Sequence, residues 1–444
     1  MIRSVLISNR GEIALRVIRA CRALDLRTVA VFSEADADAL HVRAADVAVQ
    51  LGPAAPRESY LSIERVLEAA RRSGADAVHP GYGFLSENWR FAEACRAAGL
   101  TFVGPPPEVI RAMGNKTEAR RRMAAAGIPV LPGSEGPVAD AAAAGTVAER
   151  VGYPVMLKAV AGGGGIGMAL VPGADRLEST FGVARRRAES AFGDGGVYIE
   201  RALDAPRHVE VQILADHHGC LVHLGERDCS IQRRHQKLVE ETPAPGLDSA
   251  LRARLHAAGL LAARTASYRN AGTVEFLVDG REFYFLEMNT RLQVEHPVTE
   301  EVTGRDLVKA QLRIAAGEPL GFGQPDITTR GAAIECRIYA EDPDRGFLPS
   351  PGTITALALP TGPGVRNEVG VEPGSVVSLH YDPLLAKLIA AGGDRDAAIA
   401  CLAAALDAYR VEGVKTTLPL LRRIAASEAF GAGRLTTRFL ERGL

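Results

Sequence analysis

Two glutamates stand out in a predicted β-hairpin whose other residues are mostly apolar. The hairpin covers about 272–288, where apolar runs flank Asp279-Gly280-Arg281. A three-residue loop with Gly280 at positive φ would place Glu275 and Glu287 on the same face, whereas a two-residue loop would place them on opposite faces. We predict the three-residue loop. Two carboxylates on one face repel each other unless a cation lies between them, so the hairpin predicts a site for Mg²⁺, which prefers oxygen ligands.

Polar side chains continue beyond this hairpin with a period of two. The spacing predicts that the strand itself continues, with a polar face in line with the two glutamates. A solvated edge strand would look similar in outline, but it usually mixes Lys, Thr and Ser, so we favour a functional face. The polar positions are Asn289, Arg291, Gln293 and Glu295, and the same alternation occurs at His208, Glu210 and Gln212.

A glycine-rich loop at 161–167 contains the pattern GxGxxG. A dinucleotide fingerprint joins a strand to a helix, whereas the apolar residues 168–171 after this loop predict a second strand. The loop is not a Walker loop either, because no GK[ST] follows. We interpret it as a glycine hairpin whose backbone N–H groups can approach phosphates, with a merely flexible surface hairpin as the alternative.

Several cationic residues could accompany phosphates at such a loop. Lys158 lies in an apolar strand just before it, where a charge is costly unless it meets an anion. Lys116 follows Gly114-Asn115 and could act similarly, although a solvated helix position is the commoner case. The segment 227–237 is unusually polar for a stretch between strands. It is either a solvated face or, with Lys158, Arg291 and Arg337, a concentrated anion site.

A group of histidines and cysteines offers residue types that could bind zinc. Its spacing fits no common zinc pattern, so we predict a turn at 216–219 between two strands instead. The residues of this group are His217, His218, Cys220, His223 and Cys229.

The elements that position these residues fall into three regions. Short apolar strands alternate with amphipathic helices up to about residue 103, which predicts a doubly wound parallel sheet. From Met113 a long helix is expected to run to Ala126, and strands then tend to follow strands, which predicts an α+β region. After Gly331 a third region of short strands is closed by a helix near 397–408.

Composition excludes several classes of protein. The 444 residues carry 52 basic and 53 acidic side chains, so no basic excess indicates a nucleic-acid partner. Apolar runs stay well below the roughly 18 residues of a membrane helix, and the N-terminus lacks the apolar core of a signal peptide. We therefore expect a cytoplasmic protein without a membrane partner.

These segments together resemble the biotin carboxylases, members of the ATP-grasp superfamily, over nearly the whole chain. The resemblance implies an N-terminal doubly wound domain (1–113), an ATP-grasp domain (114–330) with a mobile lid at about 131–203, and a C-terminal domain (331–444). The segments that carry it are Ser8-Asn9-Arg10-Gly11-Glu12-Ile13-Ala14, His79-Pro80-Gly81-Tyr82-Gly83-Phe84-Leu85-Ser86-Glu87-Asn88, Glu226-Arg227-Asp228-Cys229-Ser230-Ile231-Gln232-Arg233-Arg234-His235-Gln236-Lys237 and Glu287-Met288-Asn289-Thr290-Arg291-Leu292-Gln293-Val294-Glu295-His296-Pro297.

The resemblance also implies the activity and the roles of residues. ATP and bicarbonate would form carboxyphosphate, with Glu295 as general base, and its CO₂ would carboxylate biotin beside Arg337. The implied metal is Mg²⁺, with Mn²⁺ as an alternative, bound by Glu275, Glu287 and Asn289. The implied ATP contacts are Lys116, Lys158, Gly164, Gly165, Glu200, Arg201, Ala202, Leu203, His208, Gln232, His235, Glu275 and Glu287. The implied bicarbonate and biotin contacts are Lys237, Arg291, Gln293, Val294, Glu295, Arg337 and Tyr82.

The chain departs from the family pattern in the glycine loop. Ile166 stands where the family usually has a basic residue, and Ala161 replaces a glycine. The sequence contains no Met-Lys-Met biotinylation motif, so we expect biotin on a separate carrier protein, a carboxyltransferase partner that selects the acyl-CoA or pyruvate acceptor, and a homodimer. Two other functions remain open at this point: an ATP-grasp ligase for another carboxylate, and a non-catalytic nucleotide-binding subunit, which only Ile166 favours.

Overall fold

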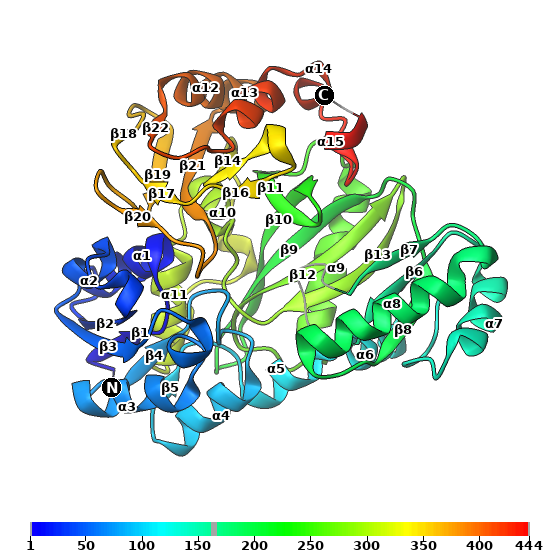
Figure 1. Ribbon diagram of the computed structural model, residues 1–444, viewed down its shortest axis with the longest axis horizontal. Coiled ribbons are helices and arrows are strands. Elements are labelled where there is room, and N and C mark those ends of the chain that lie inside the picture. Colours follow the sequence, from blue (N-terminus) through cyan, green and yellow to red (C-terminus); the bar gives the residue numbers. More distant parts are fainter. Residues whose placement is uncertain (1, 161–166, 443–444) are drawn as a thin grey trace.

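The computed structural model describes residues 2–160 and 167–442. Its N-terminal region is a parallel five-stranded sheet with strand order β3-β2-β1-β4-β5, which confirms the predicted doubly wound sheet (Figure 1). The order reverses between β1 and β4, and in open α/β sheets such a switch point forms a crevice at the carboxyl ends of the strands. The elements are β1 Ser4–Ile7, α1 Gly11–Arg22, β2 Arg27–Ser33, α2 Leu40–Ala44, β3 Val47–Gly52, α3 Ile63–Ser73, β4 Ala77–His79, α4 Trp89–Ala97 and β5 Thr101–Phe102.

Two helices connect this sheet to the rest of the chain, where the sequence predicted one. Helix α5 (Pro107–Gly114) ends before Asn115, and α6 (Lys116–Ala125) begins after it. The prediction of a single helix from Met113 to Ala126 is therefore wrong. Asn115 is the reason, because its extended backbone interrupts the helix and its side chain accepts a hydrogen bond from the backbone N–H of Glu118 at 3.0 Å as an N-cap.

A small separate unit follows, at the right of Figure 1. Three antiparallel strands in the order β7-β6-β8 pack against two helices through their own apolar core. Strand β7 follows the glycine loop directly, which confirms that the GxGxxG pattern opens no helix. The predicted loop residues 161–166, including Gly164, Gly165 and Ile166, lie outside the described residues. The elements are α7 Ala141–Val151, β6 Val155–Ala159, β7 Ala169–Val171, α8 Ala174–Phe192 and β8 Val197–Arg201.

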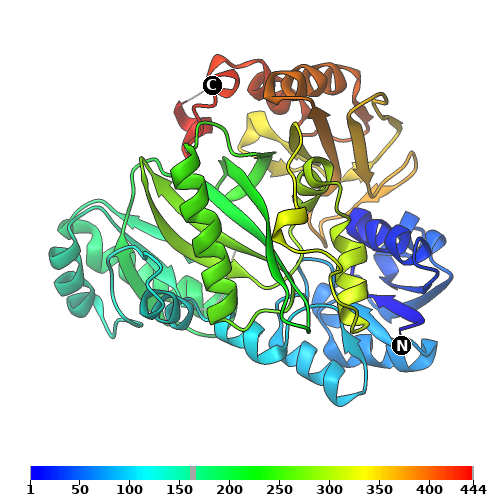
Figure 2. The same cartoon turned by 180° about the vertical axis from the view of Figure 1, so that it is seen from behind.

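The largest element is an antiparallel sheet of eight strands in the order β13-β12-β9-β10-β11-β14-β21-β19. Helix α9 covers one face of its β9–β12 half (Figure 2). Strand β11 lies before residue 331 and β14 lies after it, and the two strands pair. One sheet therefore joins the two regions that the sequence alone separates at this residue. The elements are β9 Arg207–Ala215, β10 Leu221–Arg233, β11 Gln236–Thr242, α9 Ser249–Thr265, β12 Asn270–Asp279, β13 Glu282–Asn289, α10 His296–Thr303, α11 Leu307–Ala315, β14 Ala332–Tyr339, β19 Val365–Val369 and β21 Leu384–Gly392.

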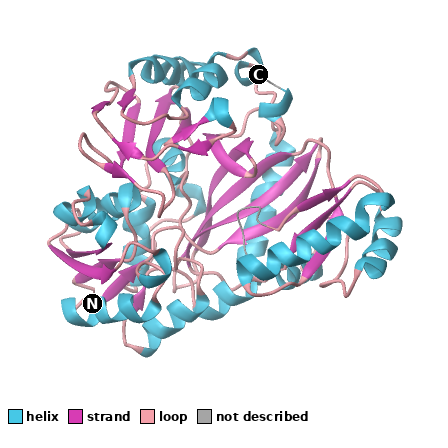
Figure 3. Ribbon diagram, viewed as in Figure 1, coloured by secondary structure: helices cyan, strands magenta, loops and turns pink. Residues whose placement is uncertain are grey.

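The C-terminal part packs helices on the β14–β21 end of this sheet. Helices α12 and α13 share one apolar core with both strands, and Figure 3 shows these helices at the outer edge of the molecule. The helices are α12 Arg395–Ala408, α13 Leu418–Ala426, α14 Glu428–Gly431 and α15 Phe439–Arg442. The short strands are β15 Glu341–Asp342, β16 Leu348–Pro349, β17 Gly352–Thr353, β18 Ala356–Ala358, β20 Val376–Val377 and β22 Arg410–Glu412.

Two smaller predictions concern turns and membrane spans. A turn at 216–219 joins β9 to β10, and Asp216 holds it by accepting hydrogen bonds from the N–H groups of His218 (2.8 Å) and Cys220 (2.9 Å). The predicted turn is therefore confirmed. Within 2–160 and 167–442, no helix has both the length and the apolar character needed to cross a bilayer.

Candidate active site

The hairpin of β12 and β13 brings the two predicted carboxylates together, but through a loop and a bulge that differ from the prediction. Asp279 pairs with Glu282, so the loop has two residues and the predicted three-residue loop is wrong. Gly280 does have positive φ, at 60°. A shift in register between the Glu275 and Phe276 pairs then compensates, because β13 has a bulge at this point. Glu275 therefore lies directly opposite Glu287, as predicted.

The polar ribbon after the hairpin is also assembled differently from the prediction. Strand β13 ends at Asn289, and residues 290–295 form a loop that leads into α10, so the prediction of a continuing strand is wrong. β13 is an edge strand, and its pairing with β12 ends at the Asn289 pair. The side chains still converge, because Asn289 and Gln293 donate to Glu275 Oε1 at 2.8 and 3.1 Å. Arg291 in turn donates to Gln293 Oε1 at 2.7 Å.

Lys237 is the cation on which three buried carboxylates converge. Its ammonium donates to Glu210 at 2.6 Å, to Glu275 at 2.9 Å and to Glu295 at 2.7 Å. Burial alone would lower the pKa of Lys237, but the three carboxylates raise it well above its usual value. Burial alone would raise the pKa of Glu275, but Lys237 and His208 together lower it well below its usual value. These shifts favour the charged forms of Lys237 and Glu275, whereas burial raises the pKa of Glu210.

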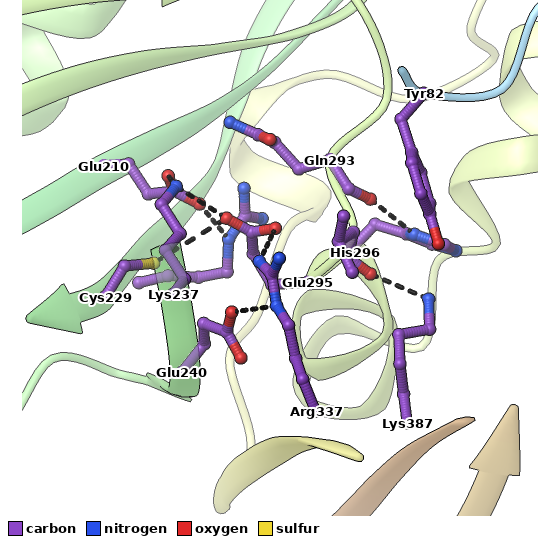
Figure 4. Close-up of polar contacts among 12 residues, drawn as sticks. Tyr82, Glu210, Cys229, Lys237, Glu240, Gln293, Glu295, His296, Arg337 and Lys387 are labelled. Atoms are coloured by element: carbon purple, nitrogen blue, oxygen red, sulfur yellow. Dashed lines mark hydrogen bonds and ion pairs between the residues drawn. The ribbon is translucent and has the colours of Figure 1, made fainter. Parts of the chain in front are cut away.

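Arg337 reaches Glu295 from the other side (Figure 4). It lies on β14, where its NH2 group donates to Glu295 at 2.9 Å and its Nε lies 2.5 Å from Glu240 Oε1. Burial raises the pKa of Glu295, but Lys237, Arg337 and Arg227 outweigh it and lower the pKa well below the usual range. Burial raises the pKa of Glu240 to about 7 despite the ion pair. Glu295 is thus an ionised carboxylate held between two cations.

Tyr82 lies in the loop after β4 of the N-terminal sheet, and its hydroxyl donates to Glu12. Asn9, at the end of β1, donates to the backbone carbonyls of Pro80 and Tyr82 at 2.7 Å each, and thereby fixes the loop after β4. Gly81 in this loop has φ of 62°, and a Cβ there would lie 2.8 Å from the Asn9 amide. The loop at the topological switch point of the sheet therefore positions Tyr82.

The described residues predicted to contact ATP lie on strands of the large sheet, on α6 and on the small unit. Lys116 forms an ion pair with Glu287, and Lys158 forms one with Glu200, which also accepts from Arg120 at 2.9 Å. His208 lies 2.9 Å from Glu275 and contacts Gln232 at 2.7 Å. The remaining predicted positions are Arg201, exposed at the end of β8, Ala202 and Leu203 just after it, and His235, exposed in the β10–β11 turn.

The polar segment 227–237 is a hairpin and not a stretch between strands. Strand β10 continues to Arg233, and β11 begins at Gln236, with positive φ at Arg234 (49°) and His235 (68°) in the turn between them. The predicted anion cluster is therefore only partly assembled: Lys237, Arg291 and Arg337 surround one centre, whereas Lys158 pairs with Glu200 on the small unit. Cys229 points to Glu295 at 3.9 Å, away from the turn that carries His218.

Sequence reasoning assigned no individual role to several residues that shape this site. Arg227 is fully buried and donates to Glu210 (2.6 Å), Gln212 (2.7 Å) and Thr299 (2.8 Å), which fixes the back of the cluster. The signal that drew attention to Lys158, a charge inside an apolar strand, also occurs at other buried positions. These positions are Glu240 on β11, Glu335 on β14 and Lys387 on β21.

The donor set at the hairpin fits a divalent cation of the magnesium type. Glu275 and Glu287 face each other across two strands, and the Asn289 amide contacts Glu275. Ligand atoms of His208, Glu210 and Glu275 also lie within 4.8 Å of one another. Two carboxylates with an amide oxygen beside lysines suit a hard cation that bridges to phosphates.

An antiparallel sheet, a small three-stranded unit with a glycine-rich sequence between β6 and β7, and facing carboxylates and lysines define an ATP-grasp enzyme. Three family models match in sequence order: "Biotin carboxylase, N-terminal domain" at 1–110, "Carbamoyl-phosphate synthase L chain, ATP binding domain" at 115–322, and "Biotin carboxylase C-terminal domain" at 335–442. Biotin carboxylase 2 of Bacillus subtilis is 55% identical over 445 residues, covering 100% of both chains. The chain belongs to the biotin carboxylase family.

Solved structures agree with this assignment. Biotin carboxylase from Campylobacter jejuni, in a βγ-ATP complex, superposes with a TM-score of 0.97 at 46% identity, covering 100% of this chain and 99% of that one. The biotin carboxylase domain dimer of 2-oxoglutarate carboxylase from Hydrogenobacter thermophilus, in complex with MgADP, ADP and bicarbonate, also has a TM-score of 0.97 at 46% identity, covering 99% and 97% of the two chains.

Proposed function

We propose that this chain carboxylates biotin on a separate carrier protein, using ATP and bicarbonate, with Glu295 as the general base. The observation that carries this assignment is the position of Glu295, which is fully buried between Lys237 at 2.7 Å and Arg337 at 2.9 Å. Lys237 belongs to the carboxylate cluster on the ATP side, and Arg337 belongs to the C-terminal part. One base thus lies where the two halves of the reaction must meet.

The ATP half of the site uses lysines and carboxylates from the hairpin and the small unit. Lys116 and Lys158 would hold the phosphates, and Glu275, Glu287 and Asn289 would hold Mg²⁺, with Mn²⁺ as an alternative. When bound, the ion offsets charge on the phosphates and so favours attack by a weak nucleophile. The further ATP contacts in this proposal are Gly164, Gly165, Glu200, Arg201, Ala202, Leu203, His208, Gln232 and His235.

The small unit at 131–203 serves as the lid of the active site in this proposal. Its core is its own, which suits movement as a body, and a closed lid would keep water from carboxyphosphate, a mixed anhydride that hydrolyses readily. The corresponding domains are 1–113, 114–330 and 331–444. The family models that match at 1–110, 115–322 and 335–442 support these limits.

Bicarbonate would bind among Lys237, Arg291, Gln293, Val294 and Glu295. A carboxylate whose pKa lies well below its usual range is a poor base. Lys237 and Arg337 must therefore turn from Glu295 toward the substrate anion before Glu295 takes the proton of bicarbonate. The resulting oxygen nucleophile attacks the γ-phosphorus, which yields carboxyphosphate and ADP.

The biotin half completes the reaction beside Arg337 and Tyr82. Carboxyphosphate breaks its C–O bond to the bridging oxygen, which leaves CO₂ and phosphate. Phosphate accepts the N1 proton of biotin, and N1 attacks CO₂ to form carboxybiotin. Arg337 stabilises the negative charge that develops on the ureido oxygen.

The partners follow from the same chemistry. A biotin carrier protein supplies the substrate, and a carboxyltransferase passes the carboxyl group to an acyl-CoA or to pyruvate. A homodimer is supported by the dimer described for the 2-oxoglutarate carboxylase domain.

Phosphate release from ATP tests the proposal. With Mg²⁺ and bicarbonate, we expect free biotin to stimulate release by the wild type, and we expect Arg337→Ala to lose that stimulation. Tight ATP binding without any biotin-dependent release would contradict the proposed function for this chain. Stimulation that persists in Arg337→Ala would contradict the role of Arg337.

A further inference from the structure

Lys387 is a fully buried lysine in the apolar strand β21. Burying an ammonium is costly unless acceptors replace its water. Its Nζ donates to the backbone carbonyl of Val294 at 2.8 Å (Figure 4). The same Nζ lies 3.3 Å from Glu12 Oε2. The Tyr82 ring centroid is 5.8 Å from the same Nζ.

The partners of Lys387 come from two other parts of the chain. Glu12, on α1, is buried and accepts a hydrogen bond from the hydroxyl of Tyr82. Glu12 Oε2 accepts no hydrogen bond from the described residues, and Lys387 is the basic residue that contacts this oxygen. Val294 lies in the loop between β13 and α10. One ammonium therefore joins β21, the N-terminal crevice and this loop.

The carbonyl that Lys387 holds lies between two site residues. Gln293 contacts Glu275 at 3.1 Å, and Glu295 contacts Lys237 and Arg337. Since residues 290–295 have left the sheet, no ladder of backbone hydrogen bonds orients them. The direction of the Val294 carbonyl fixes the peptide plane between Val294 and Glu295 and so orients the Glu295 side chain. The preceding peptide plane is held separately, because the Gln293 carbonyl contacts His296 Nδ1 at 2.8 Å.

We propose that Lys387 is a positioning residue that orients the Val294–Glu295 segment for bicarbonate, while Glu12 and Tyr82 tie the same ammonium to the biotin side. This inference rests on the proposed function. Lys387 acts through Val294 and does not itself touch the reacting atoms. Its loss should therefore weaken bicarbonate binding far more than ATP binding.

Steady-state kinetics of Lys387→Met test this inference. We expect the KM for bicarbonate to rise tenfold or more, with the KM for ATP within twofold of the wild type. Lys387→Met leaves Glu12 buried without its cation, so the double variant Lys387→Met/Glu12→Gln is made as well; a Gln side chain can still accept from Tyr82. We expect the double variant to regain most of the lost Tm while its bicarbonate KM stays high.

The control and the opposing outcomes separate this inference from the proposed function. Lys415→Met, at an exposed position in the C-terminal part, should leave both KM values unchanged. A wild type without bicarbonate- and biotin-dependent release contradicts the proposed function. An active wild type contradicts the role of Lys387 if Lys387→Met keeps its bicarbonate KM, if its ATP KM rises in parallel, or if the bicarbonate KM recovers together with Tm in the double variant.

Discussion

Replacing Glu295 with Gln removes the proposed base while keeping the shape of the side chain. General-base catalysis typically contributes about 10²–10⁴-fold. We therefore expect kcat to fall by about 10²–10⁴-fold, which corresponds to about 3–5 kcal/mol of transition-state stabilisation at about 1.4 kcal/mol per tenfold. Both cations that contact Glu295 face other carboxylates, so the variant is expected to fold.

The stability change can be bounded from the same contacts. Glu295 accepts two charged hydrogen bonds, and two such bonds are worth about 3–6 kcal/mol if nothing replaces them. Lys237 keeps Glu210 at 2.6 Å and Glu275 at 2.9 Å, and Arg337 keeps Glu240 at 2.5 Å. The loss should therefore stay near the lower bound, with Tm lowered by a few degrees.

The assay compares Glu295→Gln with Glu226→Gln. Glu226 is a buried carboxylate on β10 that accepts from Arg252 at 2.8 Å and contacts His256 at 2.6 Å, outside the site. Both variants should lose some Tm, but only Glu295→Gln should lose biotin-dependent phosphate release at saturating substrates. A kcat for Glu295→Gln within threefold of the wild type, or an equal loss in Glu226→Gln, would refute the assignment of the base.

Two further predictions concern stability and metal binding. Burial lowers the pKa of both His41 and His79 to about 4, whereas an unfolded histidine binds its proton near pH 6.5. The contribution of these neutral histidines to stability is therefore complete above pH 6.5 and is lost as pH falls toward 4. Between pH 7 and pH 5, each histidine should lower the free energy of unfolding by about 2 kcal/mol. Tm should therefore fall less steeply with decreasing pH in His41→Asn than in the wild type. An equal slope in both proteins would argue against this cause. Glu287→Gln removes one of the two facing carboxylates of the hairpin while keeping the shape of the side chain. Calorimetry should then show MgATP binding weakened tenfold or more, and unchanged binding would contradict the assigned metal ligands.

The sequence predicts much of the fold, because the strongest patterns are local. The βαβ alternation before residue 103 gives the parallel sheet, and the apolar runs around Asp279-Gly280-Arg281 give the hairpin. The bulge in β13 escapes prediction because one extra residue leaves the composition of a strand unchanged. The pairing of β11 with β14 escapes it as well, because the two strands lie far apart in the chain.

The site residues also divide into those that local sequence motifs identify and those that depend on contacts between distant parts of the chain. Motif segments identify Lys237, Arg291 and Glu295, and the structure brings these residues together. Glu240 and Lys387 lie in apolar strands of the sheet that crosses residue 331, and only their tertiary contacts explain their charge. A charged residue inside an apolar strand is the signal that could have found them.

ATP activates bicarbonate in the proposed reaction, and isotope transfer tests this step most directly. In carboxyphosphate the bridging oxygen comes from bicarbonate and stays with phosphorus when CO₂ leaves. Turnover with ¹⁸O-labelled bicarbonate, ATP, Mg²⁺ and biotin should therefore yield inorganic phosphate that carries one labelled oxygen, detected by mass spectrometry within the time that bicarbonate keeps its label. Biotin-dependent turnover that produces unlabelled phosphate would contradict the account.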